Sequence, residues 1–212
     1  MKRLLLFGPL LAALVHAEAA RGQVWEKEGN IYSGPRGHPR QLTKSGLDSA
    51  PTLSPDGKTV AYVRATPGKE IATGSGRSEA TQLWIVKAGG QDPRMLLEGV
   101  ERSEANNLLA DFQVPQFSSD GRSIYFLSAA YATSGAIHRI QVKSGREHFV
   151  CPGNSLEVIT SGEYKGNLIV QQHRYFLGAG SYDWYWLLRA DGREVGPIGE
   201  DAANFRHLYL EQ

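Results

Sequence analysis

The 212-residue chain contains a single cysteine, Cys151, so no disulfide bond can form within it. A chain of this length can bury enough apolar surface to fold without such a bond. We expect Cys151, which stands directly before a proline, to be a buried side chain and not a redox-active thiol. Stability is therefore expected to come from packing alone.

The chain also lacks a hydrophobic run long enough to span a bilayer. Its longest apolar stretch, residues 4–15, follows a short basic start and precedes several small residues. This three-part layout is typical of a secretory signal peptide, and the run is too short for a transmembrane helix. We expect residues 1–19 to be cleaved on export, which predicts a periplasmic or secreted protein.

An excess of charge of one sign is missing as well. Without residues 1–19, basic and acidic residues are equal in number, 21 of each. A neutral chain has no overall field that attracts nucleic acid or an anionic membrane. The sequence therefore predicts no nucleic-acid partner and no membrane span. It favours a protein partner or a component of the cell envelope, and leaves an oligomer open.

Residue patterns that carry catalysis are absent from the sequence. The six histidines do not stand at metal-ligand spacing, and the acidic pair Glu200-Asp201 has no calcium-loop pattern. No Gly-x-Ser-x-Gly nucleophile motif occurs, and the nearest match, residues 153–157, lacks the second glycine. The chain is also expected to end before a hydrolase domain could follow. We therefore expect no enzyme activity, no catalytic residues, no metal and no cofactor.

What the sequence does contain is a repeated segment. Residues 51–63 read PTLSPDGKTVAYV, and residues 115–127 read PQFSSDGRSIYFL. Each copy predicts a strand, a tight Asp-Gly turn and a second strand. Two further short strands follow each copy, so one repeat has the content of a propeller blade. Internal repetition of this kind predicts a β-propeller.

The spacing of the repeats defines the expected blades. Asp56 and Asp120 lie 64 positions apart, whereas one blade takes roughly 40–45 residues. Residues 66–81, which are rich in Gly, Ser and Thr, account for the excess as an inserted surface loop. A weaker third copy follows the first two. Blades are expected at residues 44–97, 111–152 and 156–198.

The two ends of the predicted domain, residues 23–212, supply a shared blade. Residues 23–43 have the pattern of half a blade only, and residues 203–210 read as one extra strand. That strand would complete the half blade, because an unpaired sheet edge invites aggregation. The predicted fold is all-β, a small β-propeller of about four blades whose first blade is closed by N- and C-terminal strands. The alternative is an incomplete propeller that is completed by dimerisation.

One set of residues carries a family resemblance: Leu42-Thr43, Asp48, Pro51, Ser54-Pro55-Asp56-Gly57-Lys58 and Val60-Ala61-Tyr62. This pattern resembles the WD40-like (PD40) repeat of the TolB-like family of periplasmic propellers. The resemblance covers about residues 31–150 and implies the propeller fold and a periplasmic location. Two departures stand out, since no separate α/β domain is recognisable and the blades are fewer than TolB's six. The same repeat also occurs in peptidases of the prolyl oligopeptidase type.

The repeated residues themselves are expected to be structural. Asp56-Gly57 and Asp120-Gly121 suit hairpin turns, because glycine adopts positive φ without steric cost. The aspartate carboxylates can accept hydrogen bonds from amide groups of the turn. We therefore assign these four residues to turn formation and not to metal binding or acid–base chemistry.

Two segments are candidates for contact with a ligand or a partner. Tyr182, Trp184 and Trp186 alternate onto one strand face, which could stack on a sugar or a peptide, although core packing between blades is favoured. The predicted loop 66–81, with Lys69 and Arg77, is the other candidate because long loops on rigid scaffolds often bind.

The sequence thus favours an exported, TolB-like propeller that acts as a non-catalytic protein-binding or envelope-binding module. The alternative is a saccharide- or peptide-acting enzyme, or an inhibitor module, that uses the central channel. Converging carboxylates or histidines in the channel would favour the alternative.

Overall fold

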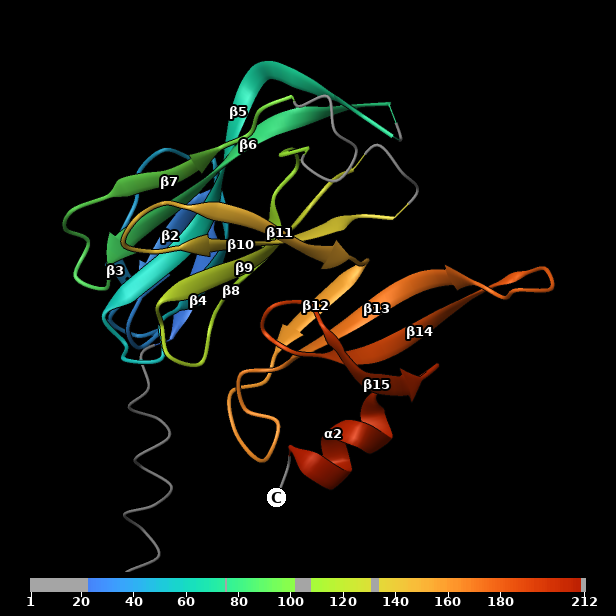
Figure 1. Cartoon of the computed structure of the whole chain (residues 1–212). Helices are drawn as coiled ribbons and strands as arrows, with labels where there is room; N and C mark the ends of the chain where they lie inside the picture. The colour runs from blue at the N-terminus through green and yellow to red at the C-terminus, as the bar shows by residue number, and fades with distance from the viewer. Residues whose placement is uncertain (1–22, 75, 102–107, 131–133, 211–212) are drawn as a thin grey trace, which may run out of the picture.

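The computed structural model describes residues 23–74, 76–101, 108–130 and 134–210, and the predicted signal peptide lies outside them. These residues form four antiparallel β-sheets that stand side by side, and a short helix at the C-terminal end (Figure 1). The all-β prediction is confirmed. None of the helices in this part of the chain is long and apolar enough to cross a membrane.

The sheets follow one another along the chain. The first contains β1 (Val24–Lys27), β2 (Asn30–Ser33) and β3 (Arg40–Gln41). The second contains β4 (Asp48–Leu53), β5 (Thr59–Thr73), β6 (Gly76–Lys87) and β7 (Arg94–Glu98). The third contains β8 (Gln113–Phe117), β9 (Ser123–Ser128), β10 (Ala136–Gln141) and β11 (Glu147–Pro152). The fourth contains β12 (Ser155–Val158), β13 (Leu168–Tyr175), β14 (Ser181–Leu188) and β15 (Glu194–Gly199).

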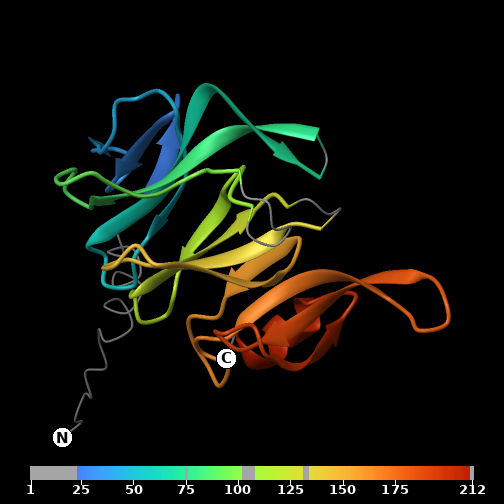
Figure 2. The same cartoon turned by 45° about the horizontal axis from the view of Figure 1, so that its top comes forward.

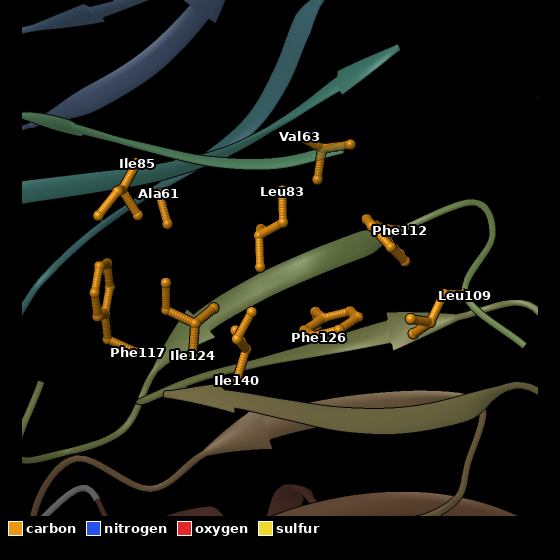
Figure 3. Packing of buried hydrophobic residues seen from close by; sticks show 10 residues of the cluster. All are labelled: Ala61, Val63, Leu83, Ile85, Leu109, Phe112, Phe117, Ile124, Phe126 and Ile140. Atoms are coloured by element: carbon orange, nitrogen blue, oxygen red, sulfur yellow. The ribbon is translucent and has the colours of Figure 1, made fainter. Parts of the chain in front are cut away.

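Strand alternation explains why the sheets stack face to face. In β5, Val60 and Tyr62 pack toward the first sheet, whereas Ala61 and Val63 pack toward the third. Successive side chains of a strand point to opposite faces, so a strand that is apolar throughout needs cover on both sides. Figure 3 shows the layer between the second and third sheets, where Leu83 of β6 faces the β9 and β10 side chains.

The C-terminal segment corrects the predicted closure. Residues Ala203–Tyr209 form helix α2 and not a strand, so they do not complete the first sheet, which has three strands without them. The reason is a helical stripe, in which Ala202 and Phe205 pack against Ile169 and Leu187 of the last sheet. A period of three to four residues places such side chains on one helix face.

The predicted loop 66–81 is also corrected. It is a β-hairpin extension of β5 and β6, here called the first arm, in which Glu70 pairs with Glu79 and Ala72 with Arg77. Its few apolar side chains are enough to anchor it, since Ile71 and Ala80 are buried against the segment that precedes β8. Backbone pairing satisfies the amide groups of a polar segment without a large apolar content.

The four sheets form an arc. The first and the fourth sheets lie at opposite ends of the row in both views (Figures 1 and 2), and α2 covers the outward face of the fourth. Terminal units of stacked architectures often carry such a cap, because their outer face has no neighbouring unit. Completion of the arc by a second copy stays a prediction.

Candidate functional site

The Asp-Gly turn of the second sheet is closed by a small set of hydrogen bonds. Ser54 Oγ donates to Asp56 Oδ1 at 2.6 Å, and the same oxygen accepts the Lys58 N–H at 3.1 Å. Ser54 Oγ in turn accepts the Thr59 N–H at 2.9 Å. Gly57 has a φ of 70°, the left-handed region that glycine adopts most easily.

The third sheet repeats this arrangement. Ser118 Oγ donates to Asp120 Oδ1 at 2.6 Å, and that oxygen accepts the Arg122 N–H at 3.0 Å. Gly121 again has a φ of 70°. The serine hydroxyl and then the backbone amide lower the pKa of Asp56 and of Asp120, because both hydrogen bonds favour the charged carboxylate. These carboxylates are engaged in the turns and are poorly suited to proton transfer.

The turns at the ends of the first strands of the second, third and fourth sheets lie next to one another. A Cβ built on Gly121 would lie 3.6 Å from Pro55 Cδ, and one built on Gly166 would lie 3.3 Å from Ser119 Oγ. The loop that joins β12 to β13 therefore contacts the turn of the third sheet, and that turn contacts the turn of the second.

A groove of about 920 Å³ runs along this row of turns. We call it the turn groove. Its residues come from β4, β8 and β12, the innermost strands, and from the turns that follow them: Thr52, Leu53, Ser54, Pro55, Asp56, Gly57, Gln116, Phe117, Ser119, Val158, Thr160, Ser161 and Lys165. Strand pairs β4–β8 and β8–β12 are in contact, so the groove is built on neighbouring sheets.

The chemistry of the turn groove is that of a binding surface. Leu53, Phe117 and Val158 supply apolar contact, and hydroxyl groups of serine and threonine supply hydrogen-bond donors and acceptors. Asp56 and Lys165 are the charged residues among those that line it. A few polar groups over an apolar lining are typical of ligand sites.

Gln116 fastens the two inner strands beneath the groove. Its Nε2 donates to the Leu156 carbonyl at 2.7 Å, and its Oε1 accepts the Val158 N–H at 2.8 Å. The side-chain amide thus takes the place of a neighbouring peptide group at the free edge of β12. This contact fixes the third sheet against the fourth and gives the groove a defined floor.

Titratable pairs elsewhere do not converge on the groove. His138 Nδ1 lies 2.6 Å from Glu147 Oε1 in the interior of the third sheet, and His173 Nδ1 lies 2.9 Å from Asp183 Oδ1 on the β13–β14 hairpin. Within the described ranges, no group of three or more His, Cys, Asp or Glu side chains could hold a metal ion. Cys151 is buried as expected, and burial raises the pKa of its thiol to about 12.

The first arm places Lys69 and Arg77 in ion pairs. Lys69 Nζ lies 2.9 Å from Glu98 Oε1, and Arg77 Nε lies 2.8 Å from Glu70 Oε2. All four side chains are largely exposed. The two candidate contact residues are therefore partnered within the chain, and they lie on a hairpin and not on the predicted surface loop.

Two of the three aromatic candidates, Tyr182 and Trp184, lie on a second hairpin extension, residues 172–184, here called the second arm (Figures 1 and 2). The Tyr182 and Trp184 rings lie 5.0 Å apart. Trp186 packs at the edge of the core, and the Arg174 guanidinium lies 3.6 Å from its ring centroid. The favoured expectation of core packing therefore applies to Trp186, whereas Tyr182 and Trp184 stand further out along the arm.

Sequence reasoning missed Thr160, Ser161 and Lys165, which follow β12 and line the turn groove. The available signal was positional, because these residues follow the first strand of a blade as Asp56 and Asp120 do. The sequence shows a third, degenerate copy with a turn at this point, but it has no Ser-x-Asp-Gly sequence, so nothing marked these residues as candidates for contact.

Comparison with known proteins supports the fold. No family model matches the chain. Over 104 residues it is 33% identical to dipeptidyl-peptidase 5 of Trichophyton equinum, a stretch that covers 49% of this chain and 12% of that protein. The chain therefore spans a small part of that relative.

Similarity to solved structures also supports the fold. The chain is similar to dipeptidyl peptidase 4 of Porphyromonas gingivalis, with a TM-score of 0.57 and 11% identity, over 85% of this chain and 31% of that one. It is also similar to a chain of the nidogen–laminin complex, with a TM-score of 0.53 and 13% identity, over 84% of this chain and 59% of that one. These similarities define the chain as a protein of β-propeller type. The resemblance to the TolB-like repeat stays a prediction.

Proposed function

We propose that this chain is an exported propeller-type module that binds an extended polypeptide in the turn groove and does not itself catalyse a reaction. The observation that carries the proposal is the groove, which joins the inner strands of three successive sheets and combines apolar side chains with hydroxyl groups. Extended peptides are recognised by such surfaces, since they offer backbone polar groups and side chains at regular intervals.

The size of the groove supports this proposal. Its volume of about 920 Å³ is near the upper end of the range typical of ligand sites. Its length crosses three sheets, which suits a chain-like ligand better than a compact one. Converging carboxylates or histidines would favour an enzyme. The lining residues of the groove include one carboxylate, that of Asp56, and no histidine.

The comparisons also favour a peptide as the ligand. Two of the similar proteins bear the name dipeptidyl peptidase. The chain spans 12% and 31% of them, so their activity as whole proteins is not carried over. The name dipeptidyl peptidase describes a protein that acts on peptides, and we assign only the binding of a peptide to the turn groove. Export to the periplasm is part of the proposal and rests on the signal-peptide pattern of residues 1–19.

A blocking substitution tests the site. Thr160 is exposed and lines the groove, so Thr160→Trp should fill it and remove most peptide binding. The matched control is Asn204→Trp, which places the same side chain on the exposed face of α2. Binding of synthetic Val- and Thr-rich peptides of different net charge is measured by fluorescence anisotropy. Equal binding by both variants and the wild type would contradict the groove as the site.

The second candidate is a peptide-acting enzyme, which the names of the similar peptidases favour. The same peptides separate the two candidates. Mass spectrometry after long incubation should recover them intact if the chain only binds. Cleavage that Thr160→Trp abolishes and Asn204→Trp retains would instead support the enzyme.

A further inference from the structure

A second cavity, of about 550 Å³, opens on the seam between the third and fourth sheets. We call it the seam pocket. Its lining residues are Arg139, Lys165, Gly166, Asn167, Arg189, Ala190, Asp191 and Val195. Lys165 lines the turn groove as well, so the two cavities share this residue.

Three cationic side chains meet at the seam pocket. Lys165 and Arg189 are exposed, and no residue that the structure describes lies within ion-pair distance of either. Arg139 is half-buried: its Nη1 donates to the Ala190 carbonyl at 3.5 Å, and its Nε is buried without a hydrogen-bond partner in the described structure. No described carboxylate lies within ion-pair distance of Arg139, so its charge adds to those of Lys165 and Arg189.

The single carboxylate of the pocket does not offset these charges. Asp191 Oδ2 lies 2.7 Å from Arg193 Nε, and its Oδ1 accepts the Arg193 N–H at 3.1 Å. Asp191 is thus paired with a cation outside the pocket lining. Because the chain as a whole is nearly neutral, three uncompensated cations at one seam are a local feature and not a reflection of overall charge.

The turn groove itself is electrically polar. Asp56 lies at the end formed by the second sheet, and Lys165 lies at the end formed by the fourth. A ligand that occupies the groove therefore meets a negative charge at one end and a positive cluster at the other. Complementary charge fixes the direction in which an elongated ligand binds.

We infer that the ligand is an acidic polypeptide segment, bound with its uncharged part in the turn groove and its Asp or Glu side chains across the seam pocket. This inference rests on the proposed function, because it specifies the peptide that the groove takes. Several carboxylates fit the site better than one, since the cations are spread over a cavity of about 550 Å³. Arginine suits this role because its planar fork binds carboxylates in a bidentate manner.

The test uses two synthetic peptides, a Val- and Thr-rich segment followed by a run of Glu, and the same sequence with Gln at every Glu position. Fluorescence anisotropy should show tighter binding of the Glu peptide and a loss of that advantage in high salt. Lys165→Ala combined with Arg189→Ala should weaken Glu-peptide binding about tenfold, the effect of two exposed ion pairs. Binding of the Gln peptide should fall by much less, because an uncharged peptide can contact only the aliphatic part of Lys165 in the turn groove.

The control is Lys143→Ala combined with Arg146→Ala. It removes one lysine and one arginine that are also exposed, but from the turn between β10 and β11. Equal affinity for the Glu and Gln peptides, or equal losses in the two double variants, would overturn the acidic-segment inference and leave the proposed function standing. If neither peptide bound, both the acidic-segment inference and the proposed function would be overturned. A free and an amidated C-terminus complete the design, since loss of binding on amidation alone would show recognition of a terminal carboxylate and overturn the inference.

Discussion

The second and third sheets share their turns but not their interiors. In both, a serine hydroxyl and two backbone N–H groups hold an Asp-Gly turn with closely similar distances. The buried polar groups differ. The second sheet contains the ion pair of Asp48 and Arg64, with Arg64 Nε at 2.6 Å from Asp48 Oδ1, whereas the third contains His138 against Glu147.

The difference follows from residues at matching places in the repeat. Tyr62 and Phe126 occupy the same place, and their cross-strand neighbours are Trp84 and His138. The Arg64 guanidinium lies 4.5 Å from the Trp84 ring centroid, a cation–π contact that the histidine of the third sheet does not provide. The comparison teaches that the turn is the conserved unit of this repeat within the chain, while each blade interior satisfies its own buried polar groups.

The largest expected effect comes from breaking the ion pair of the second sheet. Asp48→Ala leaves the Arg64 guanidinium without its partner in a largely buried position, and should lower the free energy of unfolding by about 3 kcal/mol. Urea denaturation measures this change in the free energy of unfolding. The matched substitution is Phe112→Leu, at the corresponding place in the second copy of the repeat, which removes no charge and should cost about 1 kcal/mol. Equal costs would show that the ion pair is not what distinguishes the two interiors.

A second comparison is between the two arms. Ile71 of the first arm is 2% exposed, so Ile71→Ala should cost about 2–3 kcal/mol. Leu177, at the tip of the second arm, is fully exposed, and Leu177→Ala should leave the thermal midpoint unchanged. A similar cost at both positions in thermal unfolding would mean that the second arm is covered in solution.

Local features of the fold were predictable from the sequence. Asp56-Gly57 and Asp120-Gly121 specify their turns through interactions within a few residues, and the alternating strands specify sheets buried on both faces. The helical conformation of residues 203–209 was not predictable from the sequence. Seven residues do not form a stable helix alone, so the packing of Phe205 on the last sheet determines the conformation.

The turn groove was only partly predictable for the same reason. Its Asp56 end belongs to a recognisable repeat, whereas Thr160 and Lys165 come from the degenerate copy and reach the groove only when three sheets stack. The seam pocket combines Arg139 of one sheet with Arg189 of the next, a proximity that no local pattern encodes.

A smaller effect is expected when the shared turn is altered in each repeat. Gly57→Ala and Gly121→Ala force a side chain into the left-handed region and should each cost about 1 kcal/mol. Nothing lies within 4 Å of a Cβ built on Gly57, and Pro55 lies 3.6 Å from one built on Gly121, so conformation and not collision sets both costs. Urea denaturation should give matching values. A cost several times larger at one glycine would break the equivalence of the turns.

The smallest effect concerns the charge on the turn carboxylates, and its sign follows from their pKa. Hydrogen bonds lower the pKa of Asp56 and Asp120 below the ordinary 3.8, so the folded state binds protons less readily than the unfolded state. The resulting stabilisation is fully present above 3.8 and is lost as the pH falls through the folded-state pKa values.

Asp56→Asn and Asp120→Asn should therefore lower the thermal midpoint slightly at neutral pH, and the difference from the wild type should shrink as the pH falls below 3.8. Both carboxylates are exposed, so solvent screening keeps the effect small. Because Ser54 and Ser118 donate the leading hydrogen bonds, Ser→Ala at either position should shift the pH dependence part of the way toward that of the Asn variant in its own turn, since the backbone N–H bond to the carboxylate stays. If only one of the two repeats showed this pH dependence, the two turns would share their geometry but not the protonation behaviour of their carboxylates.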